Sequence, residues 1–201
     1  MKQFIETSNK IYNFSSCEIC QANCCNGQKG TLFAQIILED FKEVYENFPI
    51  VFIFGELGYI KPVVLLTNGN SFCKYLKEYK CTIYEKRPSI CRVYPLSANI
   101  DNKIYIDELC PAVDESFDEN NYIVKDNAIH KNFDYKTLHE YQDKYIETFH
   151  ELDQFNKKED FSLAIQINGI QFFKFKKDVD NKYMQMHQKS LIHLQDGYFK
   201  N

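Results

Sequence analysis

The sequence lacks tryptophan and contains little glycine, proline or arginine. Among 201 residues there are seven Gly, five Pro and only two Arg. So few Gly and Pro exclude a collagen-like or linker-like chain. The net charge is −4, from 24 Lys and Arg against 28 Asp and Glu. An acidic chain lacks the basic surface on which nucleic-acid affinity depends, so we expect no nucleic-acid partner.

Long apolar segments are also missing. The longest runs, Ile50–Phe54 and residues 63–66, have the length of β-strands and fall far short of the ~20 residues that span a bilayer. The first ten residues contain no apolar run ahead of a small-residue cleavage site, as a secretory signal would. We therefore expect no membrane association and place the chain in the cytoplasm, where thiols stay reduced.

Composition and periodicity predict an α+β fold. With 44% apolar residues the chain can bury a core. Apolar residues at helical spacing predict helices that begin at Glu39-Asp40 and at Asp134, and a last helix near the C-terminus. The predicted helices cover residues 39–48, 134–155 and 180–194. The predicted strands cover residues 32–38, 50–54, 59–66 and 103–107.

The second half of the chain differs from the first in its pattern. Asn168-Gly169 lies between two apolar segments, Phe161–Ile167 and Ile170–Phe175, and predicts a two-residue β-hairpin. All eight cysteines precede residue 111. We therefore expect a small, metal-stapled Cys-rich domain with short strands and helices at residues 1–115. A helix-and-hairpin extension at residues 116–201 would pack on it.

Four cysteines fall within the nine residues from Cys17 to Cys25. The Cys17-x-x-Cys20 spacing lets two sulfurs bind one metal, and thiolates favour zinc and iron–sulfur centres. Since neighbouring side chains of an extended segment diverge, Cys24 and Cys25 are expected to suit a polynuclear centre or two sites. Disulfides, unligated core thiols and a thioredoxin-type redox pair are the alternatives, and a reducing compartment favours metal.

The later cysteines lie near both arginines of the chain. Arg87 and Arg92 flank Cys91. A planar, permanently charged guanidinium can hydrogen-bond the sulfurs of a negatively charged centre, or it can hold an anionic substrate or a carboxylate. Two unrelated surface arginines are the alternative. With Cys73, Cys81 and Cys110 added, the count allows two Cys₄ sets.

These segments resemble the bacterial cysteine-cluster family of the YkgJ type, which is described as zinc- or iron-chelating and carries a CxxCxxCC-like motif. The matching pieces are Cys17-x-x-Cys20-x-x-x-Cys24-Cys25, Cys73-x-Tyr-Leu and Cys81-x-Ile-Tyr84-Glu-x-Arg87-Pro-x-x-Cys91-Arg92-x-Tyr94-Pro. The resemblance covers residues 14–112. The three-residue spacing before Cys24 departs from the family and is similar to the related flagellin lysine N-methylases.

We predict that the cysteines bind an iron–sulfur cluster, with the 4Fe–4S type favoured, or zinc. The predicted ligands are Cys17, Cys20, Cys24, Cys25, Cys73, Cys81, Cys91 and Cys110. The residues predicted to surround the centre are Arg87, Arg92, Tyr84 and Tyr94. No catalytic residue is predicted. The alternatives are a protein-modifying, lysine N-methylase-like enzyme, as the resemblance implies, and a zinc-stapled module whose C-terminal part binds a protein.

Overall fold

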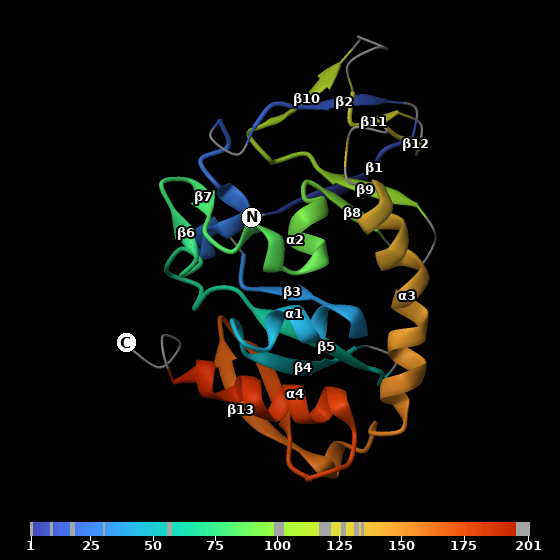
Figure 1. The fold of residues 1–201 in the computed structure, drawn as a ribbon. Helices are drawn as coiled ribbons and strands as arrows, with labels where there is room; N and C mark the ends of the chain where they lie inside the picture. Colours follow the sequence, from blue (N-terminus) through green and yellow to red (C-terminus); the bar gives the residue numbers. More distant parts are fainter. Residues whose placement is uncertain are drawn as a thin grey trace.

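The computed structural model describes residues 2–195 except positions 9, 17–18, 30, 56–57, 99–102, 117–121, 126–127, 131–132 and 134. In that part of the chain, four α-helices accompany several small antiparallel sheets, which confirms the α+β class (Figure 1). The predicted helix start at Asp134 falls outside the described residues. None of the described helices contains an apolar stretch that could span a bilayer.

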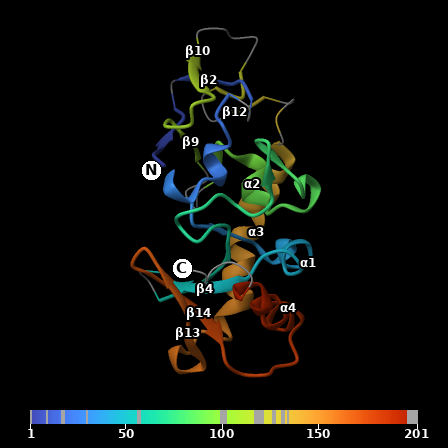
Figure 2. The ribbon, with the colours of Figure 1, turned by 90° about the vertical axis from the view of Figure 1, so that its left-hand side faces the viewer.

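A five-stranded sheet forms one end of the molecule (Figures 1 and 2). In spatial order its strands are β13 (Phe161–Ile167), β14 (Ile170–Phe175), β4 (Ile50–Phe54), β5 (Ile60–Leu65) and β3 (Phe33–Gln35). The hairpin was predicted correctly: Asn168 and Gly169 have φ values of 49° and 81°, as a type I′ turn requires. Because β14 pairs with β4, segments more than 100 residues apart share this sheet.

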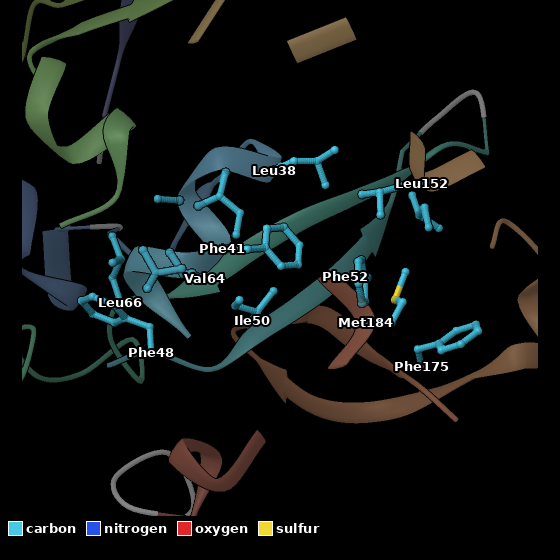
Figure 3. Close-up of a cluster of buried hydrophobic side chains, with 14 of the residues drawn as sticks. Leu38, Phe41, Phe48, Ile50, Phe52, Val64, Leu66, Leu152, Phe175 and Met184 are labelled. Carbon is cyan, nitrogen blue, oxygen red and sulfur yellow. The ribbon is translucent and has the colours of Figure 1, made fainter. Parts of the chain in front are cut away.

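The main core lies on one face of this sheet (Figure 3). Phe41, Ile50 and Phe52 are fully buried there. Phe52 also meets Phe161 edge to face, with ring centroids 5.5 Å apart. Burial of each such side chain stabilises the fold by about 1.5–3 kcal/mol. The covering elements are η3 (Leu38–Asp40), α1 (Phe41–Val44) and α4 (Lys182–Ser190), which continues as η6 (Leu191–Leu194).

Two smaller sheets form the other end of the molecule (Figure 1). One has the order β1 (Phe4–Glu6), β9 (Ile104–Asp107), β8 (Leu96–Ala98). The other has the order β10 (Val113–Ser116), β2 (Ile11–Phe14), β11 (Val124–Lys125), β12 (Ala128–Ile129). Of these strands only β9 was predicted, although β2 and β10 have the same length of four residues.

Helix α3 (Tyr135–Asp153) runs alongside both ends of the molecule (Figure 1). Its predicted apolar stripe is buried at Leu138, Tyr141 and Leu152. Leu138 joins the core of the smaller sheets, and Leu152 joins the main core. Strands from both sides of residue 115 share sheets, since β2 pairs with β10 and β11 and β4 pairs with β14. The division into residues 1–115 and 116–201 stays a prediction.

Candidate metal centre

Five cysteines line one cavity of about 350 Å³. They are Cys24, Cys25, Cys73, Cys81 and Cys91. Cys24 and Cys25 end the 3₁₀ turn η1 (Asn23–Cys25), Cys81 lies in the hairpin of β6 (Leu76–Lys77) and β7 (Lys80–Cys81), and Cys91 lies on α2 (Ser89–Val93). The fold therefore brings thiols from both cysteine-rich segments to one place, beside β3 and α3.

The sulfurs of the adjacent pair do not diverge. Cys24 Sγ and Cys25 Sγ are 3.8 Å apart, so the prediction of diverging side chains was wrong. That prediction assumed an extended backbone, whereas the pair lies in a 3₁₀ turn. Two sulfurs on adjacent corners of a tetrahedron, each at the ~2.3 Å Zn–S bond length, also lie about 3.8 Å apart. The pair is thus spaced as two ligands of a single ion would be.

A left-handed turn precedes this pair. Gln21 and Ala22 have φ values of 50° and 52°, which non-glycine residues seldom adopt. The turn lies between Cys20 and Cys24, where the Asn23 amide donates a 3.1 Å hydrogen bond to the Cys20 carbonyl. Beyond it, the Cys73 amide donates a 2.8 Å hydrogen bond to the Cys25 carbonyl, so the backbone itself joins the first and second cysteine-rich segments.

Asp40 fixes the start of the helix that carries Cys91. Its Oδ1 accepts hydrogen bonds from the Ser89 amide at 2.9 Å and the Ser89 hydroxyl at 2.6 Å, and its Oδ2 accepts one from the Ile37 amide at 3.2 Å. Asp40 is buried, and burial raises the pKa of its carboxyl while the bonds from Ser89 and Ile37 lower it. The carboxyl thus ties α2 to the turn that precedes α1.

Cys20 and Cys110 lie together in a different small buried cluster, with Ala112. Burial raises the pKa of Cys110 to about 11. Next to Cys110, the Tyr94 hydroxyl donates a 2.8 Å hydrogen bond to the fully buried carboxylate of Asp107. The predicted ligand Cys17 lies outside the described residues. All seven described cysteines are free thiols, five at the cavity and two in this cluster.

The cavity favours negative charge at Cys24. Its pKa is lowered to about 7, first by the hydrogen bond with Cys25 and then by the positive charges of Lys2 and Arg87. The same hydrogen bond, together with burial, raises the pKa of Cys25. Burial raises the pKa of Cys73 to about 11. Cys24 therefore ionises more easily than an ordinary cysteine, and the thiolate is the form that binds metal.

The four residues predicted to surround the centre take different places. Arg87 and Tyr94 line the cavity. The Arg87 guanidinium lies 3.6 Å from the centre of the exposed Tyr84 ring, and its Nε atom is buried without a hydrogen-bond partner. Arg92 is exposed on α2 and does not line the cavity. Lys2 also lines the cavity but was not predicted, because no motif in the surrounding sequence indicates a role for it.

The chemical types of the side chains around the cavity suit a metal, but their positions in the structure do not yet form a complete set of ligands. Soft thiols favour zinc or iron, and the two nearby cations can offset the charge of a thiolate-bound centre. In the part of the chain that the structure describes, however, no three Cys, His, Asp or Glu side chains are arranged to hold an ion. Beyond the Cys24–Cys25 pair, further thiols would have to rotate toward a bound metal.

The comparison with protein families agrees with this donor set. Residues 16–111 match the family model CxxCxxCC, described as "Putative zinc- or iron-chelating domain". These residues therefore form a domain of that family, which confirms the resemblance to a metal-chelating cysteine-cluster family. No curated protein and no solved structure matches the chain. The relation to flagellin lysine N-methylases stays a prediction.

Proposed function

We propose that the thiols of the cavity bind one zinc ion, with Cys24 and Cys25 as two of its ligands. The observation that supports this most strongly is the 3.8 Å separation of their sulfurs. Cys73, Cys81 and Cys91 line the same cavity and are the candidates for the remaining ligands. A 4Fe–4S cluster takes one thiolate per iron and so separates the sulfurs further. The Cys24–Cys25 pair, which was predicted to suit a polynuclear centre, therefore favours a single zinc ion.

The charges around the cavity support four thiolates and a divalent ion. That combination carries a net charge of −2, which Lys2 and Arg87 can offset. A closed set of four thiolates is typical of structural zinc. We infer that the ion holds together η1, the β6–β7 hairpin and α2, which contain few hydrogen bonds of regular secondary structure. In this proposal the protein works where thiols stay reduced, as in the cytoplasm.

Elemental analysis of protein purified without oxygen tests the proposal. We expect one zinc per chain and neither iron nor acid-labile sulfide. Cys24→Ser should lower the zinc content, whereas Cys20→Ser, the matched change in the other thiol cluster, should leave it unchanged. Stoichiometric iron with sulfide would show that the site holds an iron–sulfur cluster instead of zinc. Absence of both metals would refute metal binding. A zinc loss in Cys20→Ser equal to that in Cys24→Ser would refute the assignment to the cavity.

A further inference from the structure

The cavity is larger than a thiolate-bound metal ion needs. A sphere with the ~2.3 Å radius of a Zn–S bond encloses only about 50 Å³. The cavity measures about 350 Å³, which falls within the range of about 300–1,000 Å³ that small-molecule sites occupy. A volume for a second occupant therefore adjoins the thiols.

Two tyrosines of α3 form part of the wall. Tyr141 and Tyr145 line the cavity. The Tyr141 hydroxyl donates a 3.3 Å hydrogen bond to the carbonyl of Gln35 in β3, and the Tyr145 hydroxyl donates one of 3.3 Å to the Gln35 side-chain oxygen. Phe149 packs edge to face on Tyr145, with centroids 4.7 Å apart. Because these contacts hold both rings, the aromatic wall is already formed before a ligand binds.

Apart from the thiols, the charged side chains of the wall have one sign. Among the described lining residues, Lys2 and Arg87 are the cationic ones, and none is acidic. The Nε atom of Arg87 is buried without a hydrogen-bond partner, although such atoms are paired in most proteins. Its guanidinium is fixed against the Tyr84 ring at 3.6 Å. A guanidinium held in this way presents a planar pair of donors that matches a carboxylate.

We propose that the cavity binds a small carboxylate with an aromatic or other apolar body, next to the metal centre. The carboxylate pairs with Arg87, and the body packs against Tyr141 and Tyr145. The location beside a metal rests on the proposed function, whereas the pocket itself does not. Arg87 and the thiols belong to the family domain at residues 16–111, and α3 lies outside it. The two tyrosines of the wall therefore lie outside the residues that match the family model.

Titration calorimetry with benzoate on the protein as purified tests the proposal. We expect benzoate to bind at least about tenfold more tightly than either benzyl alcohol, which lacks the charge, or acetate, which lacks the body. Arg87→Met should weaken benzoate binding by about tenfold or more, and Arg87→Lys should weaken it less. Equal binding of benzyl alcohol, or no binding of benzoate, would overturn the proposal.

Tyr145→Leu tests the aromatic wall with little loss of apolar volume. It should weaken benzoate binding severalfold, whereas Tyr135→Leu, an exposed position of α3 that does not line the cavity, should have no effect. Equal effects of the two changes would contradict the assignment. The metal content of each variant is measured in parallel. If the purified protein contains metal but does not bind benzoate, the carboxylate pocket alone is refuted. If it binds benzoate but contains no metal, the proposed function alone is refuted.

Discussion

The cavity and the core beside α4 both contain buried polar groups, but the buried histidine of the core has all its hydrogen-bond partners, whereas the arginine of the cavity does not. In the core, His187 is fully buried. Its Nε2 accepts a hydrogen bond from the Phe175 amide at 3.1 Å, so Nδ1 carries the proton and donates to the Ile50 carbonyl at 2.8 Å. In the cavity, Arg87 Nε has no such partner. Buried groups with every hydrogen bond made stabilise the fold, whereas the cavity leaves a donor of Arg87 unsatisfied.

The core and the cavity also shift the pKa values of their titratable groups in different ways. Burial lowers the pKa of His187 to about 4, because the apolar surroundings exclude the charged ring. At Cys24, the Cys25 thiol and two cations lower the pKa to about 7, which makes the charged form accessible near neutral pH. The core therefore keeps a titratable group neutral, and the cavity prepares one to carry charge.

Metal removal should separate the two regions most strongly. Structural zinc contributes on the order of 10 kcal/mol to folding, and in the proposed site that contribution falls on the segments around the cavity. We expect chelation to raise amide hydrogen exchange in η1, β6–β7 and α2 far more than in β13–β14. An equal rise in all these segments would contradict the assignment of the metal to the cavity.

His187→Ala should damage the core and spare the cavity. It leaves the Phe175 amide and the Ile50 carbonyl unpaired and opens a void, so we expect a loss of about 4 kcal/mol in the free energy of unfolding. His139→Ala, at an exposed position of α3, should cost less than about 0.5 kcal/mol. Denaturant unfolding and zinc analysis measure both. Zinc loss in folded His187→Ala would show that the two regions are coupled.

Acid should destabilise the core through the same residue. Between pH 6.5, the ordinary pKa of His, and pH 4, the unfolded chain binds a proton that the folded chain does not. The free energy of unfolding should therefore fall by up to about 3 kcal/mol as the pH is lowered through this window. The readout is the difference between wild type and His187→Gln at each pH, since the titration of other groups cancels. A difference that does not vary with pH would contradict the low pKa.

Asp40→Asn should affect both regions at once, by a smaller amount. Losing the charged acceptor of Ser89 should cost about 1–2 kcal/mol of stability and about tenfold in zinc affinity, because Cys91 is less firmly positioned. Glu39→Gln, the exposed neighbour, is the control. Competition with a chromophoric chelator measures the affinity. Unchanged affinity with reduced stability would mean that Asp40 supports the fold alone.

The smallest effect is expected at the hairpin turn. Gly169→Ala places a side chain at φ +81° and should cost about 1 kcal/mol. Asn168→Gly, which relieves a φ of +49°, should cost less, and neither change should alter zinc content. Thermal unfolding measures both variants. A larger loss from Asn168→Gly than from Gly169→Ala would contradict the type I′ turn.

Local patterns predicted the elements that depend on nearby residues. The hairpin at Asn168-Gly169, the strand Ile50–Phe54 and the long amphipathic helix at 134–155 were all recognisable. The predicted strand at 32–38 was too long, because a 3₁₀ turn begins at Leu38. Short strands such as β1 were missed, since Phe4 pairs with Asp107 and nothing near either residue signals that partner.

The sequence predicted the chemical type of the site, but not how its residues are arranged. Cysteine spacing and the arginines beside Cys91 indicated a thiolate centre, and Arg87 does line the cavity. The role of Tyr141 and Tyr145 was not predictable, because helical periodicity shows that a face is covered and does not show by what. The 3.8 Å sulfur pair depends on a 3₁₀ turn that follows two left-handed residues, which no spacing rule reveals.

By itself, the sequence determined the soft donors, the scarce arginines and the amphipathic segments, because these follow from residue types and their spacing. Only the tertiary structure decided that five thiols share a cavity with Arg87, while Cys20 and Cys110 lie in another cluster. It also decided that two tyrosines of α3 line that cavity. The physical reason is that such neighbours are set by the burial of distant apolar surfaces against one another, a global condition that no local pattern contains.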